Sequence, residues 1–215
     1  MSVLSKKTLW ERIHRVDDPL AISPLLDPAQ VQAASIDVRI GHQFIVLQRA
    51  AVSHVDPSES SLLTRSLHRT QQKVRVQTKQ KFVIHPRQLV LAATLEYISM
   101  SKDLAAMVEG RSSWGRLGLI IATACSVAPG FKGCITLELV NDGEVPIVLR
   151  PGMRIAQLVF FDAGKESDYR DATTKAKVAT NTIAQPDRSL ARFTETKKLR
   201  FGASQAREQE LTFVY

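Results

Sequence analysis

Hydrophobic and polar residues alternate along much of the chain with the period of a β-strand. In the segment SIDVRIGHQFIVL, Ile36, Val38 and Ile40 are separated by Asp37 and Arg39. Successive side chains on a strand point to opposite faces, so this segment is predicted to be a strand. The later segments KVRVQTKQKFVIHP and QLVLAATLEYISM are predicted to be β as well.

The clearest β pattern lies in residues 134–161. Three apolar runs are separated by two turn-forming sequences, NDG from Asn141 and RPG from Arg150. Asp-Gly and Pro-Gly pairs favour tight turns between strands. This region is therefore predicted to be a three-stranded meander.

Helical patterns are short. Ser5 can cap a helix in SKKTLWERIH, and a second short helix is expected in DPAQVQAA, with Asp27 as its cap, Pro28 in the first position and Gln30 three residues after the cap. The sequence shows no long amphipathic helix and no internal repeat. The predicted fold is mainly β, a distorted barrel or jelly roll with a few short helices.

Two polar regions of the sequence indicate how the chain is divided into a domain and its additions. Residues 52–72 are irregular and are predicted to form a long surface excursion. After Phe161 the chain turns polar, so we expect a β domain at residues 1–161 and a C-terminal extension at residues 162–215. The extension is predicted to order against a ligand or partner as a lid, although a mobile tail is equally compatible with its sequence.

The composition of the chain restricts the kinds of protein that it can be. The 215 residues are 44% hydrophobic, which suits one domain with additions, and no apolar run is long enough to span a membrane. The N-terminus lacks a signal-peptide pattern, so a cytoplasmic location is expected. The net charge of +8 is scattered, which makes nucleic-acid binding only a minor hypothesis. Two cysteines, Cys125 and Cys134, lack the spacing of a zinc site.

The stretch EGRSSWGRLGL has the composition of an anion-binding loop. Ser112 and Ser113 can begin a helical turn whose N–H groups point outward, and Arg111 and Arg116 supply planar, always charged guanidinium groups. Such a loop can hold a phosphate group. The residues alone leave open that Arg116 pairs with a carboxylate and that the serines only cap a helix.

Glu138 lies inside a strand that is otherwise apolar. Alternation places it on the face opposite Leu137 and Leu139. A carboxylate in this position needs a partner or a chemical role. Either a salt bridge to an arginine or a general base beside the basic loop would explain it, and the sequence leaves both open.

Four motifs resemble the dCTP deaminase branch of the dUTPase superfamily. SIDVRIG, GRSSWGRLGL, PGFKGCITLELVN and LRPGMRIAQLVFF occur in the order and approximate spacing of that family. The resemblance implies a distorted β-barrel or jelly roll and a homotrimer with active sites between subunits. It also implies hydrolytic loss of ammonia from C4 of the cytosine of dCTP, without a catalytic metal or other cofactor.

The resemblance assigns roles to individual residues. Glu138 would be the general base, and Ser112 and Arg116 would position the water and stabilise the developing charge. Mg²⁺ would accompany the triphosphate. The substrate-binding residues implied in this way are Arg111, Ser112, Ser113, Ala124, Gln157, Tyr169, Lys175 and Lys177.

The chain also departs from the family pattern. Ala128 stands where relatives commonly have an aspartate, which argues against additional cleavage of dUTP. In the tail, Ala176 and Thr180 stand where relatives have a lysine and a glutamine. Three hypotheses follow: an active dCTP deaminase, a nucleotide-binding regulatory or defence-type relative with little turnover, and a bifunctional deaminase–diphosphatase, which Ala128 disfavours.

Overall fold

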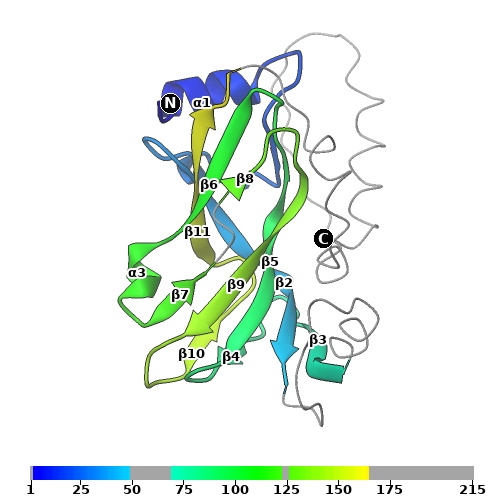
Figure 1. Cartoon of the computed structure of the whole chain (residues 1–215), viewed down its shortest axis with the longest axis vertical. Helices are drawn as coiled ribbons and strands as arrows, with labels where there is room; N and C mark the ends of the chain where they lie inside the picture. The colour runs from blue at the N-terminus through cyan, green and yellow to red at the C-terminus, as the bar shows by residue number, and fades with distance from the viewer. Residues whose placement is uncertain (1, 49–68, 123–125, 165–215) are drawn as a thin grey trace, which may run out of the picture. The chain divides into compact units, whose positions relative to one another are not determined.

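The computed structural model describes residues 2–48, 69–122 and 126–164, and Figure 1 shows these as ribbons. Helix α1 spans Lys6–Ile13, the 3₁₀ turn η1 spans Pro28–Gln30, and helix α3 spans Ser112–Gly115. The strands are β1 (Ala21–Ser23), β2 (Ile36–Leu47), β3 (Gln71–Arg75), β4 (Phe82–Ile84), β5 (Leu89–Ser99), β6 (Leu104–Gly110), β7 (Leu119–Ile121), β8 (Ser126–Val127), β9 (Lys132–Asn141), β10 (Ile147–Leu149) and β11 (Arg154–Asp162). No helix in these ranges is long and apolar enough to cross a membrane.

The strands form one large antiparallel sheet and one small one. The large sheet has the order β7-β9-β5-β2-β11-β6-β8, with β1 added to β5 and β3 added to β2, and β10 pairs with β4 in the small sheet. Buried residues from most of these strands, such as Phe44, Ile98, Leu137 and Phe160, share one hydrophobic core. The prediction of a mainly β protein with few short helices is confirmed.

The large sheet curls until its two ends approach each other. β7 stands at one end of the strand order and β6 lies next to the other end. A Cβ atom placed on Gly110, the last residue of β6, would lie 3.6 Å from the side chain of Ile121 in β7. Strand β7, which follows α3, pairs with β9, and Figure 1 shows β7 between α3 and β9.

The predicted meander is wrong in its pairing, although all three of its strands exist. β9 pairs with β5 and β7, β10 pairs with β4, and β11 pairs with β2 and β6. Turn sequences determine where a chain reverses, but they do not select the neighbouring strand. Each of these strands instead buries its apolar face against partners that are distant in the sequence.

The short helices follow their capping residues. Ser5 accepts a hydrogen bond from the Thr8 N–H at 3.3 Å and caps α1, as predicted. Asp27 and Gln30 form the expected capping box, but the second helix is only the single turn η1. It ends at Gln30 because the next residue, Val31, has an extended backbone and pairs with Ile36 in an antiparallel bridge.

Two segment boundaries also differ from expectation. The predicted surface excursion at residues 52–72 falls largely outside the described residues, but its last two residues, Gln71 and Gln72, belong to β3. The segment at residues 73–86 is not one continuous β region. Strands β3 and β4 are separated by a turn in which the Gln80 N–H donates to the Gln77 carbonyl at 3.0 Å.

Two polar residues of β2, Asp37 and Arg39, are buried rather than exposed. Arg39 donates its backbone N–H to Glu96 of β5 at 2.8 Å, and its guanidinium lies 3.4 Å from the same carboxylate. Gln30 completes the cluster through its own amide, 3.1 Å from Glu96. Glu96 is fully buried, and desolvation raises its pKa although Arg39 and Gln30 stabilise the ionised form. The cluster fixes η1, β2 and β5 to one another.

Candidate active site

The loop that carries most of the candidate residues is helix α3 with its flanking residues. Ser112 and Ser113 begin α3 and are exposed, so the predicted helical turn is confirmed. Trp114 donates its indole N–H to the carbonyl of Arg154 at 2.8 Å. This bond anchors α3 to β11, so the two serines are held at the surface by a fixed support.

Arg111 is held by a buried carboxylate. Its guanidinium lies 3.3 Å from Asp37, whose side chain is only 4% exposed. Arg154 contacts the same carboxylate at 3.4 Å and Asp27 at 2.7 Å. Asp37 therefore orients two guanidinium groups and neutralises only one of them. The Arg111 side chain remains 35% exposed, so it stays accessible to a ligand.

Gln157 belongs to the same group of residues. In β11 it is paired in register with Asp37 of β2 on one side and with Glu109 of β6 on the other. Its amide donates to Glu109 at 3.1 Å and accepts from the Ser35 hydroxyl at 3.4 Å. Gln157 therefore lies next to Asp37, the carboxylate that holds Arg111, and its amide already forms two hydrogen bonds.

Glu138 occupies the position that alternation predicted. It is half-buried on the face of β9 opposite Leu137 and Leu139, which are fully buried. Among the residues that the structure describes, none donates a hydrogen bond or forms an ion pair with its carboxylate. A salt bridge to an arginine within these ranges is therefore not the reason for this carboxylate.

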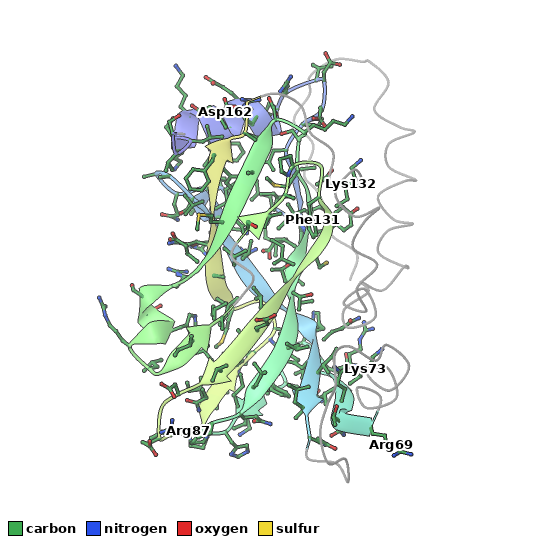
Figure 2. All side chains as sticks on the ribbon, in the orientation of Figure 1. Arg69, Lys73, Arg87, Phe131, Lys132 and Asp162 are labelled. Carbon is green, nitrogen blue, oxygen red and sulfur yellow. The ribbon has the colours of Figure 1, made fainter. Side chains whose placement is uncertain are left out.

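Backbone pairing places β9 beside the segment that follows α3. Ile121 of β7 pairs with Leu139, and the Ala122 N–H donates to the Glu138 carbonyl at 2.8 Å. Figure 2 marks the ends of β9: Lys132 is its first residue, and Arg87 donates at 3.1 Å to Asp142 just after its last. Glu138 thus lies between these ends, on the strand next to β7.

The predicted residues fall into three groups. Arg111, Ser112, Ser113 and Arg116 lie together around α3, with Gln157 paired beside Asp37, the carboxylate that holds Arg111. Glu138 lies on β9 without a direct hydrogen bond to them within the described ranges. Arg116 is exposed and forms no ion pair with any described carboxylate. Four further predicted residues lie outside the described part of the chain: Ala124, Tyr169, Lys175 and Lys177.

Gly118 sets the path from α3 to β7. Its φ is +88°, and an added Cβ would lie 2.7 Å from the backbone nitrogen of Gly143. We expect Gly118→Ala to lower the free energy of unfolding by about 2 kcal/mol or more, because the left-handed backbone and the contact are both unfavourable for a side chain. Urea unfolding followed by circular dichroism measures this difference.

Gly115 provides the matched control for this experiment. It lies in α3, three residues away, and an added Cβ would meet nothing within 4 Å. Gly115→Ala should leave stability unchanged or raise it by up to about 1 kcal/mol. An equal loss of unfolding free energy in the two variants would show that the close contact between Gly118 and the backbone of Gly143 does not constrain the loop.

Three residues that shape the site were not singled out from the sequence: Asp37, Trp114 and Arg154. A signal for Asp37 was present, because it is a carboxylate within an apolar strand, as Glu138 is. Trp114 and Arg154 gave no such signal, since their contact depends on the packing of α3 against β11.

Residues 3–163 match the family model described as dCTP deaminase-like. The chain belongs to this family. Among curated relatives, "dCTP deaminase, dUMP-forming" of Methanobrevibacter smithii is 40% identical over 161 residues, which cover 74% of this chain and 80% of the relative. The protein of the same name from Halobacterium salinarum is 42% identical and covers 77% and 83%, respectively. A "dCTP deaminase" of Natronomonas pharaonis is 44% identical, with coverage of 74% and 79%.

A solved structure shares the fold of this family member. The 2'-deoxycytidine 5'-triphosphate deaminase of Agrobacterium tumefaciens superposes with a TM-score of 0.54 at 24% identity. The match covers 73% of this chain but only 45% of that longer protein. The predicted mainly β fold is thus one that this solved deaminase shares.

Proposed function

We propose that the protein catalyses the hydrolytic deamination of dCTP to dUTP and ammonia. The observation that carries the proposal is Glu138, a half-buried carboxylate with no described partner, on a strand next to the segment that follows α3. Of the curated relatives between 40% and 44% identical, two are named "dCTP deaminase, dUMP-forming" and one "dCTP deaminase", so their names support the deamination and leave the final product to be tested. Such an enzyme would act on free nucleotides in the cytoplasm.

Glu138 is the group suited to activate water in this reaction. It removes a proton from the water whose oxygen adds to C4 of the cytosine, and the proton passes to the ring. The C4 hydroxyl of the tetrahedral intermediate then gives up its proton and the amino nitrogen takes one up. The bond from C4 to that nitrogen breaks, and ammonia leaves while the C4 carbonyl forms. A positioned base of this kind contributes about 10²–10⁴-fold to the rate.

Ser112 and Arg116 complete the proposed catalytic set. The Ser112 hydroxyl can hold the attacking water, and the exposed guanidinium of Arg116 can stabilise negative charge that develops near C4. Both lie in or directly after α3, which the bond from Trp114 to Arg154 fixes in place. Their orientation therefore does not depend on a free loop.

The triphosphate would bind to Arg111, Ser112 and Ser113, with Mg²⁺ bound to the phosphate oxygens. Asp37 holds Arg111 in a fixed orientation before the nucleotide arrives, which reduces the entropy lost on binding. In the proposed complete site, Gln157, Ala124, Tyr169 and either Lys175 or Lys177 add further contacts. The lysines would come from the C-terminal extension, which we propose to act as a lid.

We also propose that the enzyme is a homotrimer with active sites between subunits. Leu89 of β5 and Ile120 of β7 flank Val140 of β9 in register, on the same face as Glu138. Leu89 is 36% exposed and Ile120 is 46% exposed. A neighbouring subunit on this face would bury this apolar row and could bring its own catalytic residues to Glu138.

The identity of the product tests this function. Purified full-length protein, incubated with dCTP and Mg²⁺, should release ammonia and accumulate dUTP on anion-exchange chromatography. Ala128 supplies only a methyl group where cleavage of the triphosphate would need a carboxylate, so dUMP should not accumulate. Accumulation of dUMP would assign the chain to the bifunctional class, and failure to form either product would refute the deaminase function.

A further inference from the structure

A second cationic site lies at the small sheet, outside the candidate active site. A cavity of about 510 Å³ opens between the turn from β3 to β4 and the end of β10. Among the described residues that line it, four are cations and none is acidic; the cations are Arg75, Lys79, Lys81 and Arg150. None of these residues is part of α3, β9 or β11.

Strand pairing gathers these cations. Leu149 of β10 pairs with Phe82 of β4, so the neighbouring residues Arg150 and Lys81 leave the two strands at the same end. Lys79 lines the cavity from the turn after β3, where its backbone is left-handed with a φ of 72°. Arg75 is the last residue of β3, a strand marked in Figure 2 by Lys73.

The base of the cavity is rigid and apolar. Val76 and Phe82 line it and are both at least nine-tenths buried. Phe82 stacks on Phe44 of the main core, with ring centroids 4.2 Å apart. The cations therefore stand on a fixed support beside a surface of low polarity, which strengthens their effect on a bound anion.

Three of the positive charges at this cavity have no ion pair with a described carboxylate. In residues 2–48, 69–122 and 126–164, no carboxylate forms an ion pair with Lys79, Lys81 or Arg150. Like charges held close together repel one another, and an anion in the cavity would remove that cost. Exposed lysines scattered on a surface would carry no such implication, but these converge on one cavity.

We propose that this cavity is an anion-binding site for an oligophosphate group. A single carboxylate or phosphate would leave most of Lys79, Lys81 and Arg150 without an anion, whereas a chain of phosphates can contact several of them. The volume lies within the roughly 300–1,000 Å³ typical of small-molecule sites. The cations surround one opening and do not form the extended stripe expected of a nucleic-acid surface. The phosphates can belong to inorganic polyphosphate or to a nucleotide.

Calorimetric titration of the full-length protein tests this site with two probes, tripolyphosphate and ATP. The Lys79→Glu/Lys81→Glu double variant should lose one binding equivalent per chain, with affinity at that site at least tenfold weaker. Its dCTP deamination should be unchanged. The Lys6→Glu/Lys7→Glu variant reverses two exposed charges on α1 and should bind like the wild type. Arg150→Gln serves as a second variant if the first does not fold.

An Arg111→Ala variant separates this site from the candidate active site. If Arg111→Ala removes one bound probe molecule per chain, that molecule occupied the candidate active site. The probe molecule bound at the proposed second site must remain in this variant, whether or not the protein is a deaminase. The site is refuted if Lys79→Glu/Lys81→Glu and Arg150→Gln both bind as the wild type does. It is also refuted if a single-stranded oligonucleotide binds there and neither small probe does. Tighter binding of ATP would identify a nucleotide, and equal binding would identify the phosphates alone.

Discussion

Glu138→Gln should lower the rate constant for ammonia release from dCTP by about 10²–10⁴-fold. The amide fills nearly the same space on β9 but cannot accept the proton of the attacking water. Binding of dCTP should be nearly unchanged, because no phosphate contact is assigned to this side chain. Steady-state ammonia assays give kcat, and calorimetry under conditions without turnover gives Kd.

Glu144→Gln is the control for this substitution. Glu144 follows β9 in the chain, its side chain is 84% exposed, and its only described ion pair is with Arg87. The same chemical change there should leave kcat within about twofold, as expected for a surface group away from the reaction. Normal turnover of the Glu138 variant would show that another group activates the water.

Arg39→Met should lower the free energy of unfolding by about 3–5 kcal/mol at neutral pH. The substitution removes the guanidinium 3.4 Å from Glu96 and leaves a fully buried carboxylate without its ion pair. Burial already raises the pKa of Glu96 in the folded protein. Denaturant unfolding measures the loss, and a second variant isolates the contribution of the buried charge.

The raised pKa of Glu96 predicts how the stability of Arg39→Met depends on pH. It also predicts the effect of adding a second substitution, Glu96→Gln. A carboxyl whose pKa is higher in the folded state stabilises folding when protonated, and this contribution is lost as pH rises from about 4.5 through the folded pKa. The loss in Arg39→Met should therefore be smaller at pH 5 than at pH 8. The Arg39→Met/Glu96→Gln variant should recover part of the stability. A double variant less stable than Arg39→Met would contradict the role of buried charge.

Much of the β architecture was predictable because alternation and caps act locally. The strand at SIDVRIG, the cap at Ser5 and the capping box at Asp27 all depend on residues within a few positions. Strand partners were not predictable in the same way, as the meander shows. β9, β10 and β11 are consecutive in the chain, yet each pairs with distant strands because the sheet curls to bury its apolar face.

The candidate site was predictable where residue type alone is unusual. Glu138 in an apolar strand and the cluster of Arg111 and Ser112 both stood out in the sequence. The support beneath them did not, because Asp37 contacts Arg111 across 74 positions. The same limit applies to Arg150, which joins Lys81 at the second cationic site only through the pairing of β10 with β4.

Hydrolysis in H₂¹⁸O, with the product analysed by mass spectrometry, tests the central claim most directly. The reaction proposed for Glu138 adds water to C4, so dUTP formed from dCTP should carry one ¹⁸O in the uracil ring and none in its phosphates. The uracil of the Glu138→Gln product should be labelled at least about a hundredfold more slowly. Label in the phosphates would show that the chain cleaves the triphosphate, and the absence of label from the base would contradict a hydrolytic deaminase.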